Sequence, residues 1–287
     1  EQAERCYSLV ADRSPSRWRW TYYRALLSSE RGGGEALSAA LREVLALAPD
    51  FGPAWLRLGD AEFKEGRSDR AEEAWNRAVT APEPERAPAE SPKHTPDAPV
   101  SAYASLGLAR IALARGDADR ARQILERIAT RAPRFGPAVR LLAESYTLLG
   151  RTADADRASY RANRLPPYAP YADPMVDVLA RESRHSTFLL RQAVEADLGA
   201  NAEWSEFLTR RAMAFDQENP DVVSRLARIL RTLGRSDEAL EFFALYNRMA
   251  PGDPQGLSAI GSCLSDLGRF AEAEPFSHHE QRSDAGD

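Results

Sequence analysis

The sequence predicts an all-α protein, an elongated solenoid in which antiparallel helix pairs stack on one another. Three observations lead to this prediction. Apolar residues recur at intervals of three and four, a glycine follows each such stretch, and the pattern returns about every 34 residues. Because one helix pair cannot bury its apolar side alone, pairs of this kind become stable when they stack.

The clearest repeat runs over residues 51–85 and predicts two helices. The apolar positions of the first and then the second helix are Trp55, Leu58, Phe63, Ala71, Trp75 and Ala78. Gly66 separates the two stretches, at a point where a helix end favours a left-handed residue. Pro82 follows the second helix, which cannot continue through it.

The same register recurs along nearly the whole chain. Glycines equivalent to Gly66 are Gly116, Gly150 and Gly234, and the small residues that permit close approach of paired helices are Ala71, Ala121, Ala155 and Ala239. Asp69 and Ser236–Asp237 follow such turns and are expected to cap the second helices. Repeats are therefore predicted to start near residues 18, 52, 102, 136, 186, 220 and 254, after an initial half-repeat.

Two interruptions break the series of repeats. Residues 86–101 are rich in proline and polar residues, which predicts an exposed loop within an N-terminal block of residues 1–169. Residues 170–185 form a linker, in which Asp173–Pro174 predicts the start of a short extra helix over the junction. This insert either binds a partner or is a spacer that alters the superhelix.

A second block of repeats is predicted over residues 186–287. The repeat that starts at Ser186 is the most divergent, because it lacks the Leu-Gly pair. Pro275 falls early in the expected last helix, so this helix should be short or broken, and a frayed tail should follow it.

Composition and charge exclude several classes of protein. The formal net charge is −5, so a strongly basic nucleic-acid-binding face is not predicted. No run of about 18 apolar residues occurs, so no membrane-spanning helix is predicted. Cys6 and Cys263 are expected to be buried small apolar residues. Because the sequence begins at Glu1 rather than methionine, an exported or periplasmic location is expected over a cytoplasmic one.

Motifs for catalysis or cofactor binding are absent from the sequence. The signatures of phosphate-binding loops, dinucleotide-binding folds, zinc proteases, hydrolases and haem attachment do not occur. The histidines have no metal-ligand spacing and are His94, His185, His278 and His279. Gly32–Gly34 is interpreted as a flexible turn. The sequence therefore predicts no enzyme, no catalytic residue, no metal site and no cofactor.

The repeats resemble the tetratricopeptide repeat, whose pattern is an aromatic residue, Leu-Gly, a tyrosine, a later alanine and aromatic residue, and a final proline. The matching residues of the clearest unit are Trp55, Leu58, Gly59, Phe63, Ala71, Trp75, Ala78 and Pro82. The resemblance covers nearly the whole chain and is to long bacterial members of the family. It implies a right-handed superhelix that acts as a non-catalytic interaction scaffold, with the first helix of each pair lining a concave groove that holds a partner segment.

The resemblance also implies which residues line this groove. Carried over to matching positions, they include Leu56, Asp60, Phe63, Lys64, Tyr103, Leu106, Arg110, Arg140, Glu144, Arg228 and Arg231. The mixture of apolar and charged residues suits an amphipathic or extended protein segment with acidic points. In the alternative, Leu56, Leu106 and Leu113 pack against neighbouring helices or the insert.

Two other functions stay open at this point. The chain could be a structural subunit of a larger assembly, bound through its edges and the insert. It could also bind a small molecule, or act as an enzyme, in a cavity between the two blocks near Tyr168, Tyr171, Arg181 and His185. The Lys/Asn-rich clamp that chaperone-binding members of the family use for a C-terminal carboxylate is absent, so binding of such tails is not expected.

Overall fold

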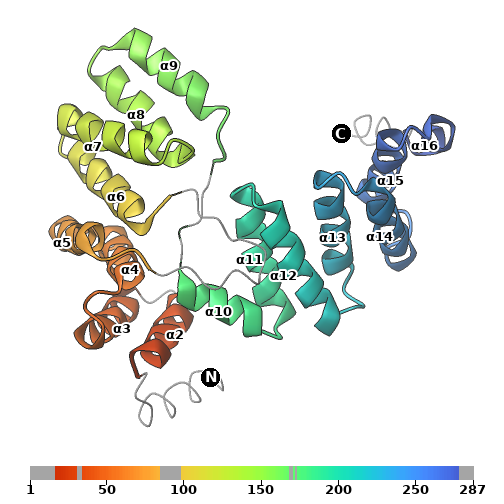
Figure 1. The fold of residues 1–287 in the computed structure, drawn as a ribbon, viewed down its shortest axis with the longest axis horizontal. Helices are drawn as coiled ribbons and strands as arrows, with labels where there is room; N and C mark the ends of the chain where they lie inside the picture. The colour runs from red at the N-terminus through yellow and green to blue at the C-terminus, as the bar shows by residue number, and fades with distance from the viewer. Residues whose placement is uncertain (1–16, 31–33, 85–97, 168–170, 172, 278–287) are drawn as a thin grey trace. The chain divides into compact units, whose positions relative to one another are not determined.

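The structure, a computed structural model, describes residues 17–30, 34–84, 98–167, 171 and 173–277. Within these ranges it is all-α, as predicted, with seven antiparallel helix pairs and one single helix (Figure 1). The pairs start at residues 17, 52, 100, 136, 186, 220 and 254, within two residues of the predicted starts. The expected initial half-repeat lies outside the described residues.

The chain divides into two compact units, residues 1–88 with 95–178 and residues 89–94 with 179–287. The paired helices of unit 1 are α2 (Arg17–Glu30), α3 (Gly34–Leu47), α4 (Gly52–Lys64), α5 (Ser68–Thr80), α6 (Val100–Ala114), α7 (Ala118–Arg131), α8 (Gly136–Leu148) and α9 (Thr152–Ala162). The single helix α10 (Pro174–Glu182) contains the boundary. Unit 2 continues with α11 (Ser186–Leu198), α12 (Ala202–Phe215), α13 (Pro220–Thr232), α14 (Ser236–Met249), α15 (Pro254–Asp266) and α16 (Phe270–Ser277).

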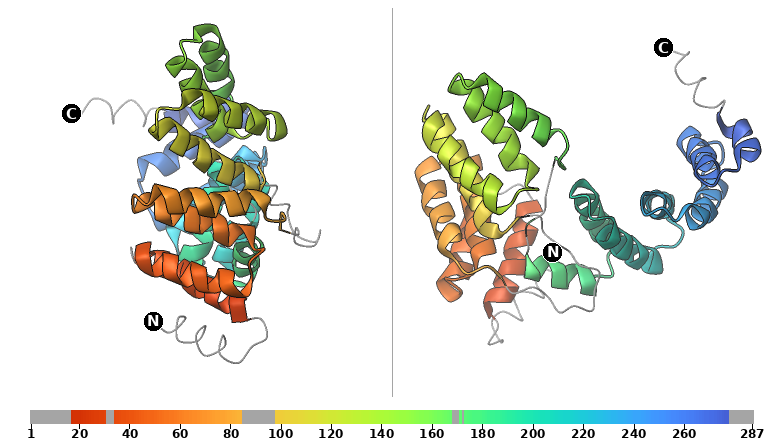
Figure 2. Two further views of the ribbon diagram at one scale, coloured as in Figure 1. Left: turned by 90° about the vertical axis from the view of Figure 1, so that its left-hand side faces the viewer. Right: turned by 45° about the horizontal axis from the view of Figure 1, so that its top comes forward.

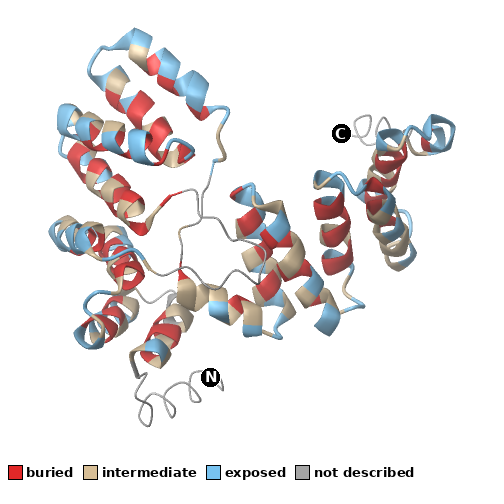
Figure 3. Cartoon of the chain, in the orientation of Figure 1, coloured by how far each residue is buried: buried red, intermediate tan, exposed pale blue. Residues whose placement is uncertain are grey.

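In unit 1 the helix pairs stack in chain order (Figure 2). The first helices of the pairs, α2, α4, α6 and α8, line one side of the stack, and the second helices line the other (Figure 1). Buried residues lie along the helix sides that face neighbouring helices (Figure 3). We call the surface formed by α2, α4, α6 and α8 the first-helix face. No described helix is both long enough and apolar enough to span a membrane.

Trp75 joins two repeats at the centre of unit 1. Its side chain is 1% exposed and its ring lies against Gly59 of α4 and Gly107 of α6. A Cβ atom built on Gly59 would lie 2.4 Å from the indole ring, and one on Gly107 would lie 2.5 Å from it. Since Cβ atoms do not approach other heavy atoms so closely, both helices need glycine at these positions.

Glu62 on α4 is a buried carboxylate that α3 and the α4–α5 turn neutralise. Its side chain is 1% exposed and accepts hydrogen bonds from the guanidinium groups of Arg42 and Arg67. Burial by itself would raise the pKa of Glu62, but the bond from Arg67 and the charge of Arg42 outweigh it and lower this pKa below its ordinary value.

The predicted turn glycines are confirmed. Gly66, Gly116, Gly150 and Gly234 have φ values of +74°, +79°, +69° and +76°. The amide of Gly66 donates to the Phe63 carbonyl oxygen and the next amide, of Arg67, donates to the Glu62 carbonyl oxygen, at 3.0 and 2.9 Å. This bonding closes the first helix through a left-handed residue.

The predicted caps of the second helices at Asp69 and Ser236–Asp237 are wrong. The second helices start earlier than predicted, at Ser68 and Ser236, so the N-cap positions of α5 and α14 fall to Arg67 and Arg235, which make no side-chain cap bond. Asp69 and Asp237 lie in the first helical turn instead. A side-chain cap forms where this turn position holds an acceptor, as in Asp117, whose carboxylate accepts from the Arg120 amide at 3.0 Å.

The divergent repeat makes the same turn without a glycine. Ala200 has φ +54°, and its amide and that of Asn201 donate to the carbonyl oxygens of Asp197 and Ala196, each at 2.9 Å. A left-handed backbone costs an alanine free energy that glycine avoids, partly offset by the greater freedom of glycine when unfolded. We expect Ala200→Gly to stabilise unit 2 by about 0.5 kcal/mol.

Thermal unfolding followed by circular dichroism measures this effect. The matched control is Gly234→Ala at the equivalent turn of the next repeat, where a Cβ would meet no atom within 4 Å. Because the same backbone cost and the same offset act there, this variant should lose about 0.5 kcal/mol. A loss of stability in Ala200→Gly, or no loss in Gly234→Ala, would contradict the assignment of strain to Ala200.

The start of the predicted extra helix is confirmed at Asp173–Pro174. The Asp173 carboxylate accepts from the amides of Met175 and Val176 at 3.2 and 3.3 Å, and α10 begins at Pro174. The last helix, α16, is short as predicted, with eight residues, and it includes Pro275 rather than stopping before it. The expected tail lies outside the described residues.

Cys263 is buried in unit 2, as predicted for it, among Leu226, Ile260 and Leu264. Burial raises the pKa of its thiol to about 11, so at pH 8 roughly one thiol in a thousand is ionised. We expect the folded chain, with Cys6→Ser, to react with a disulfide reagent at least about a hundredfold more slowly than the urea-unfolded chain. Comparable rates would show that Cys263 is accessible. Cys6 lies outside the described residues.

Candidate partner-binding face

The structure places nine of the eleven predicted groove residues in unit 1 and two in unit 2. Those of unit 1 lie on α4, α6 and α8. Leu56 and Leu106 are 2% and 4% exposed and belong to the apolar core of unit 1. These two residues therefore pack against neighbouring helices, the alternative to partner contact. Arg228 and Arg231 lie on α13, where Arg231 pairs with Asp266 of α15 at 2.8 Å.

Phe63 and Tyr103 are half-buried and support the helix stack. The Phe63 ring lies 5.4 Å from the Trp75 ring, centroid to centroid. The Tyr103 ring lies 4.5 Å from Phe135 and 5.4 Å from Tyr171. Both aromatic side chains therefore contribute to packing within unit 1 and leave only part of their surface for contact with a partner.

Arg140 binds the chain's own backbone. Its guanidinium group donates to the carbonyl oxygens of Ala162, Leu165 and Pro166, at 3.4, 3.0 and 3.2 Å. A cation at the end of α9 satisfies carbonyl groups that the helix leaves unpaired. The position predicted for partner contact thus fixes the path of the chain after α9.

The exposed charges form a row on the first-helix face. Asp60, Arg110 and Glu144 are exposed and occupy one repeat position, each six residues before the turn glycine of its pair. Lys64 lies one helical turn beyond Asp60. In the described part of the chain, Lys64, Arg110 and Glu144 form no ion pair or hydrogen bond through their side chains. Neighbouring atoms of the stack exclude part of the water around the Asp60 carboxylate and raise its pKa, although the residue stays exposed, and the charges of Arg57, Arg110 and Lys64 oppose this rise.

A buried polar cluster on this face combines residues that lie far apart in the sequence. The Tyr22 hydroxyl donates to Asp173 Oδ2 at 2.6 Å, and Arg57 Nη2 donates to the same oxygen at 3.0 Å. Arg57 Nε also donates to the Tyr22 hydroxyl oxygen at 2.7 Å. Burial raises the pKa of Tyr22 well above its ordinary value, and the charge of Asp173 adds to the increase, while Arg57 opposes it.

Sequence reasoning missed Arg57 and the tertiary role of Asp173. The Asp-Pro pair indicated a helix start, but nothing local indicates that Asp173 reaches α2 and α4, which are 151 and 116 residues away along the chain. Tyr171 belongs to the same site, since Arg57 Cζ lies 5.4 Å from its ring centroid. The predicted insert therefore contacts the first-helix face of unit 1.

The residues expected for a cavity between the blocks do not form a described site. Tyr171 lies in unit 1, Arg181 and His185 lie in unit 2, and Tyr168 is outside the described residues. Arg181 packs over the Trp204 ring at 5.5 Å, and His185 Nδ1 accepts from the Phe188 amide at the start of α11. Both therefore have structural roles within unit 2.

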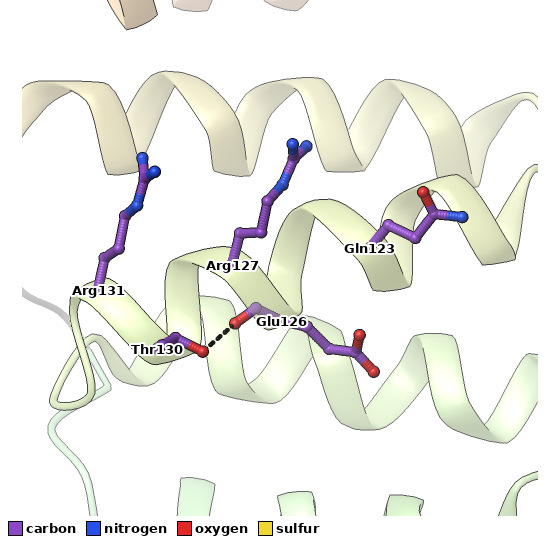
Figure 4. A pocket seen from close by; sticks show the side chains of 5 residues that line it. All are labelled: Gln123, Glu126, Arg127, Thr130 and Arg131. Atoms are coloured by element: carbon purple, nitrogen blue, oxygen red, sulfur yellow. Dashed lines mark hydrogen bonds between the residues drawn. The ribbon is translucent and has the colours of Figure 1, made fainter.

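A shallow depression on α7 is lined by Gln123, Glu126, Arg127, Thr130 and Arg131 (Figure 4). The Thr130 hydroxyl donates to the Glu126 carbonyl oxygen at 2.9 Å. All five residues come from one helix at intervals of one to four, so they form a stripe of helix surface. A catalytic site needs polar groups that converge from several elements. Among the described residues, no group of three or more potential metal ligands comes together.

Comparisons with known proteins agree with this architecture. The tetratricopeptide repeat family model matches residues 34–90, 93–137, 106–170 and 189–254, more than half of the chain. Comparison with curated proteins finds no match.

Solved structures with low similarity include MamA, at 15% identity, with 62% of this chain and 97% of that chain covered and a TM-score of 0.34. Another is the type IV pilus biogenesis factor PilW, at 13% identity, with 88% and 100% covered and a TM-score of 0.41. A third is a tetratricopeptide repeat protein from Parabacteroides merdae ATCC 43184, at 11% identity, with 93% and 92% covered and a TM-score of 0.41. By the match of the family model, this chain belongs to the tetratricopeptide repeat family.

Proposed function

We propose that this chain is a non-catalytic scaffold that binds a segment of a partner protein on the first-helix face of unit 1. Proteins built from this repeat bind other proteins, and the fold is typically non-catalytic. The observation that supports the choice of face is the row Asp60, Arg110 and Glu144, which three successive first helices expose at one repeat position.

The row has alternating negative, positive and negative charge, with Lys64 beside its first member. A partner segment with basic, acidic and basic residues at matching intervals complements it. Charges at the edge of an interface orient the partner and speed association, while half-buried apolar side chains supply contact area. Phe63 and Tyr103 are half-buried on the same helices.

Photo-crosslinking tests this proposal. A benzoylphenylalanine at position 110 should form adducts with a partner in the source cells, whereas the same residue at position 127 on α7 should not. Arg127 is the matched control because it is an exposed arginine on a second helix. Arg110→Glu should reduce adducts formed from position 144 at least about tenfold, and Arg127→Glu should leave them unchanged. Equal adducts from both faces, or none from positions 64, 110 and 144, would refute the proposal.

A further inference from the structure

Three residues of the insert reach the first helices of unit 1. Tyr171, Asp173 and Met175 alternate along the chain, and each contacts the first-helix face, with Arg57 shared by Tyr171 and Asp173. The segment belongs to none of the helix pairs of unit 1. It therefore lies on this face as a bound peptide would, although it is part of the same chain.

The middle contact is a carboxylate site. Asp173 Oδ2 accepts from both Tyr22 and Arg57, and the Asp173 side chain is 5% exposed. Two donors converging on one oxygen, one of them charged, make a strong and directional hydrogen-bonding site. Tyr22 and Arg57 come from α2 and α4, so the site exists only where the two first helices meet.

An aromatic site and an apolar site flank the carboxylate site. The centroid of the Tyr171 ring lies 5.4 Å from Arg57 Cζ and 5.4 Å from the centroid of the Tyr103 ring. Tyr171 also packs against the apolar cluster that contains Trp75. Met175 packs on the apolar core that α2, α3, α4 and α5 share, and its carbonyl oxygen accepts from the Tyr23 hydroxyl at 3.1 Å. The face thus recognises an aromatic residue, an acidic residue and an apolar residue at alternate positions.

Asp173 is buried, but the rest of the docked segment is still partly open to solvent. Tyr171, Pro174 and Met175 are half-buried, and the Arg57 side chain is 29% exposed. The cores of the helix pairs are formed mainly by the helices themselves. Release of this segment would uncover the three sites without dismantling any helix pair.

We propose that Tyr171, Asp173 and Met175 act as an internal competitor for a partner segment with the pattern aromatic, any residue, acidic, any residue, apolar. This inference rests on the proposed function, since it specifies the partner and the regulation of the same face. A partner segment of this pattern displaces the internal one and takes the same three sites. The internal segment, tethered at high effective concentration, raises the apparent dissociation constant for the partner.

A peptide-binding measurement on the full chain tests the competition. The probe is a fluorescent peptide with the sequence of residues 166–180, PPYAPYADPMVDVLA. The opened variant is Tyr171→Ala with Asp173→Ser, in which the serine can still cap α10. Fluorescence anisotropy should show that the opened variant binds the peptide at least tenfold more tightly than the unmodified chain. Adding Arg57→Met, or replacing the peptide's aspartate by asparagine, should remove this gain.

The matched control is Glu182→Gln, an exposed carboxylate on α10 outside the three sites, which should bind as the unmodified chain does. Equal binding by the opened variant and the unmodified chain, or binding by neither, would overturn the inference. In that case adducts from position 110 but not 127 would still support the proposed function. Without those adducts, both proposals fail.

Hydrogen exchange gives a second readout that requires no substitution. The amides of Met175 and Val176 donate to Asp173 Oδ1. The hydrogen bonds of Oδ2 with Tyr22 and Arg57 hold this cap of α10 in place, so the cap should loosen when the segment leaves the face. Excess peptide should speed their exchange in the unmodified chain at least threefold if it displaces the segment. The peptide with asparagine in place of aspartate should not. Unchanged exchange at saturating peptide would contradict displacement.

Discussion

Replacing Gly59 with alanine should lower the free energy of unfolding of unit 1 by about 2 kcal/mol, even though alanine favours helix formation. The new Cβ would lie 2.4 Å from the Trp75 indole, which is 1% exposed and is held on its other side by Gly107. The rigid ring has no room to retreat, so the strain exceeds the gain of up to about 1 kcal/mol in helix propensity.

Urea unfolding followed by circular dichroism measures the effect. Gly52→Ala on the same helix is the matched control, because its Cβ would meet its nearest atoms at 3.4 Å or more. It should change stability by less than about 0.5 kcal/mol. Gly107→Ala should behave like Gly59→Ala. If Gly59→Ala matched Gly52→Ala instead, the tight contact with Trp75 would be wrong.

Removing both arginines that neutralise Glu62 should also cost about 2 kcal/mol at pH 7. In Arg42→Ala with Arg67→Ala, the buried carboxylate loses both charged partners. The cost lies below that of a fully buried pair because the arginine side chains are 48% and 30% exposed, so water replaces them in part.

The way in which Glu62 makes the free energy of unfolding depend on pH should have opposite signs in the unmodified chain and in the double variant. In the unmodified chain the pKa of Glu62 is lowered, so its contribution to stability is present above the ordinary glutamate pKa and is lost as the pH falls through the lower, folded value. In the double variant only the neighbouring Ser38 hydroxyl still opposes burial, which is the largest cause, so the pKa of Glu62 should rise above the ordinary value. Lowering the pH from 7 towards 5 should therefore reduce the deficit of the double variant.

The urea midpoints of unfolding of the unmodified chain and of the double variant, measured between pH 5 and 7, show how the deficit in stability changes with pH. Adding Glu62→Gln to the double variant removes the stranded charge and should abolish the pH dependence of the difference, and it should recover part of the loss at pH 7. A constant deficit across this range would show that Glu62 does not carry the effect.

The repeat framework could be predicted because its signals are local. Gly66, Gly150 and Gly234 mark helix ends within a few residues, and the apolar spacing identifies the buried side of each helix. The exposed positions Asp60 and Arg110 follow from the same register. The predicted caps were wrong because the second helices start earlier than expected, at Ser68 and Ser236, which places Arg67 and Arg235 at the N-caps.

Contacts between distant parts of the chain could not be predicted in this way. Register alone did not identify Gly107, in the next repeat, as the second neighbour of Trp75. It also made Arg140 a candidate for partner contact, although its guanidinium group reaches the carbonyl oxygens after α9. The docking of Asp173 on Tyr22 and Arg57 depends on tertiary geometry that no spacing encodes.

The two oxygens of Asp173 perform separate tasks, since Oδ1 starts α10 while Oδ2 anchors the segment to α2 and α4. A carboxylate is flat and rigid, so the heading of the first turn of α10 is coupled to the anchor through only two side-chain torsions. The aspartate thus couples the direction of α10 to the position of α2 and α4. Glutamate at this position would keep the charge but add one methylene and one more torsion between the backbone and the carboxylate. The direction of the first turn of α10 would then no longer be fixed by the contact with α2 and α4.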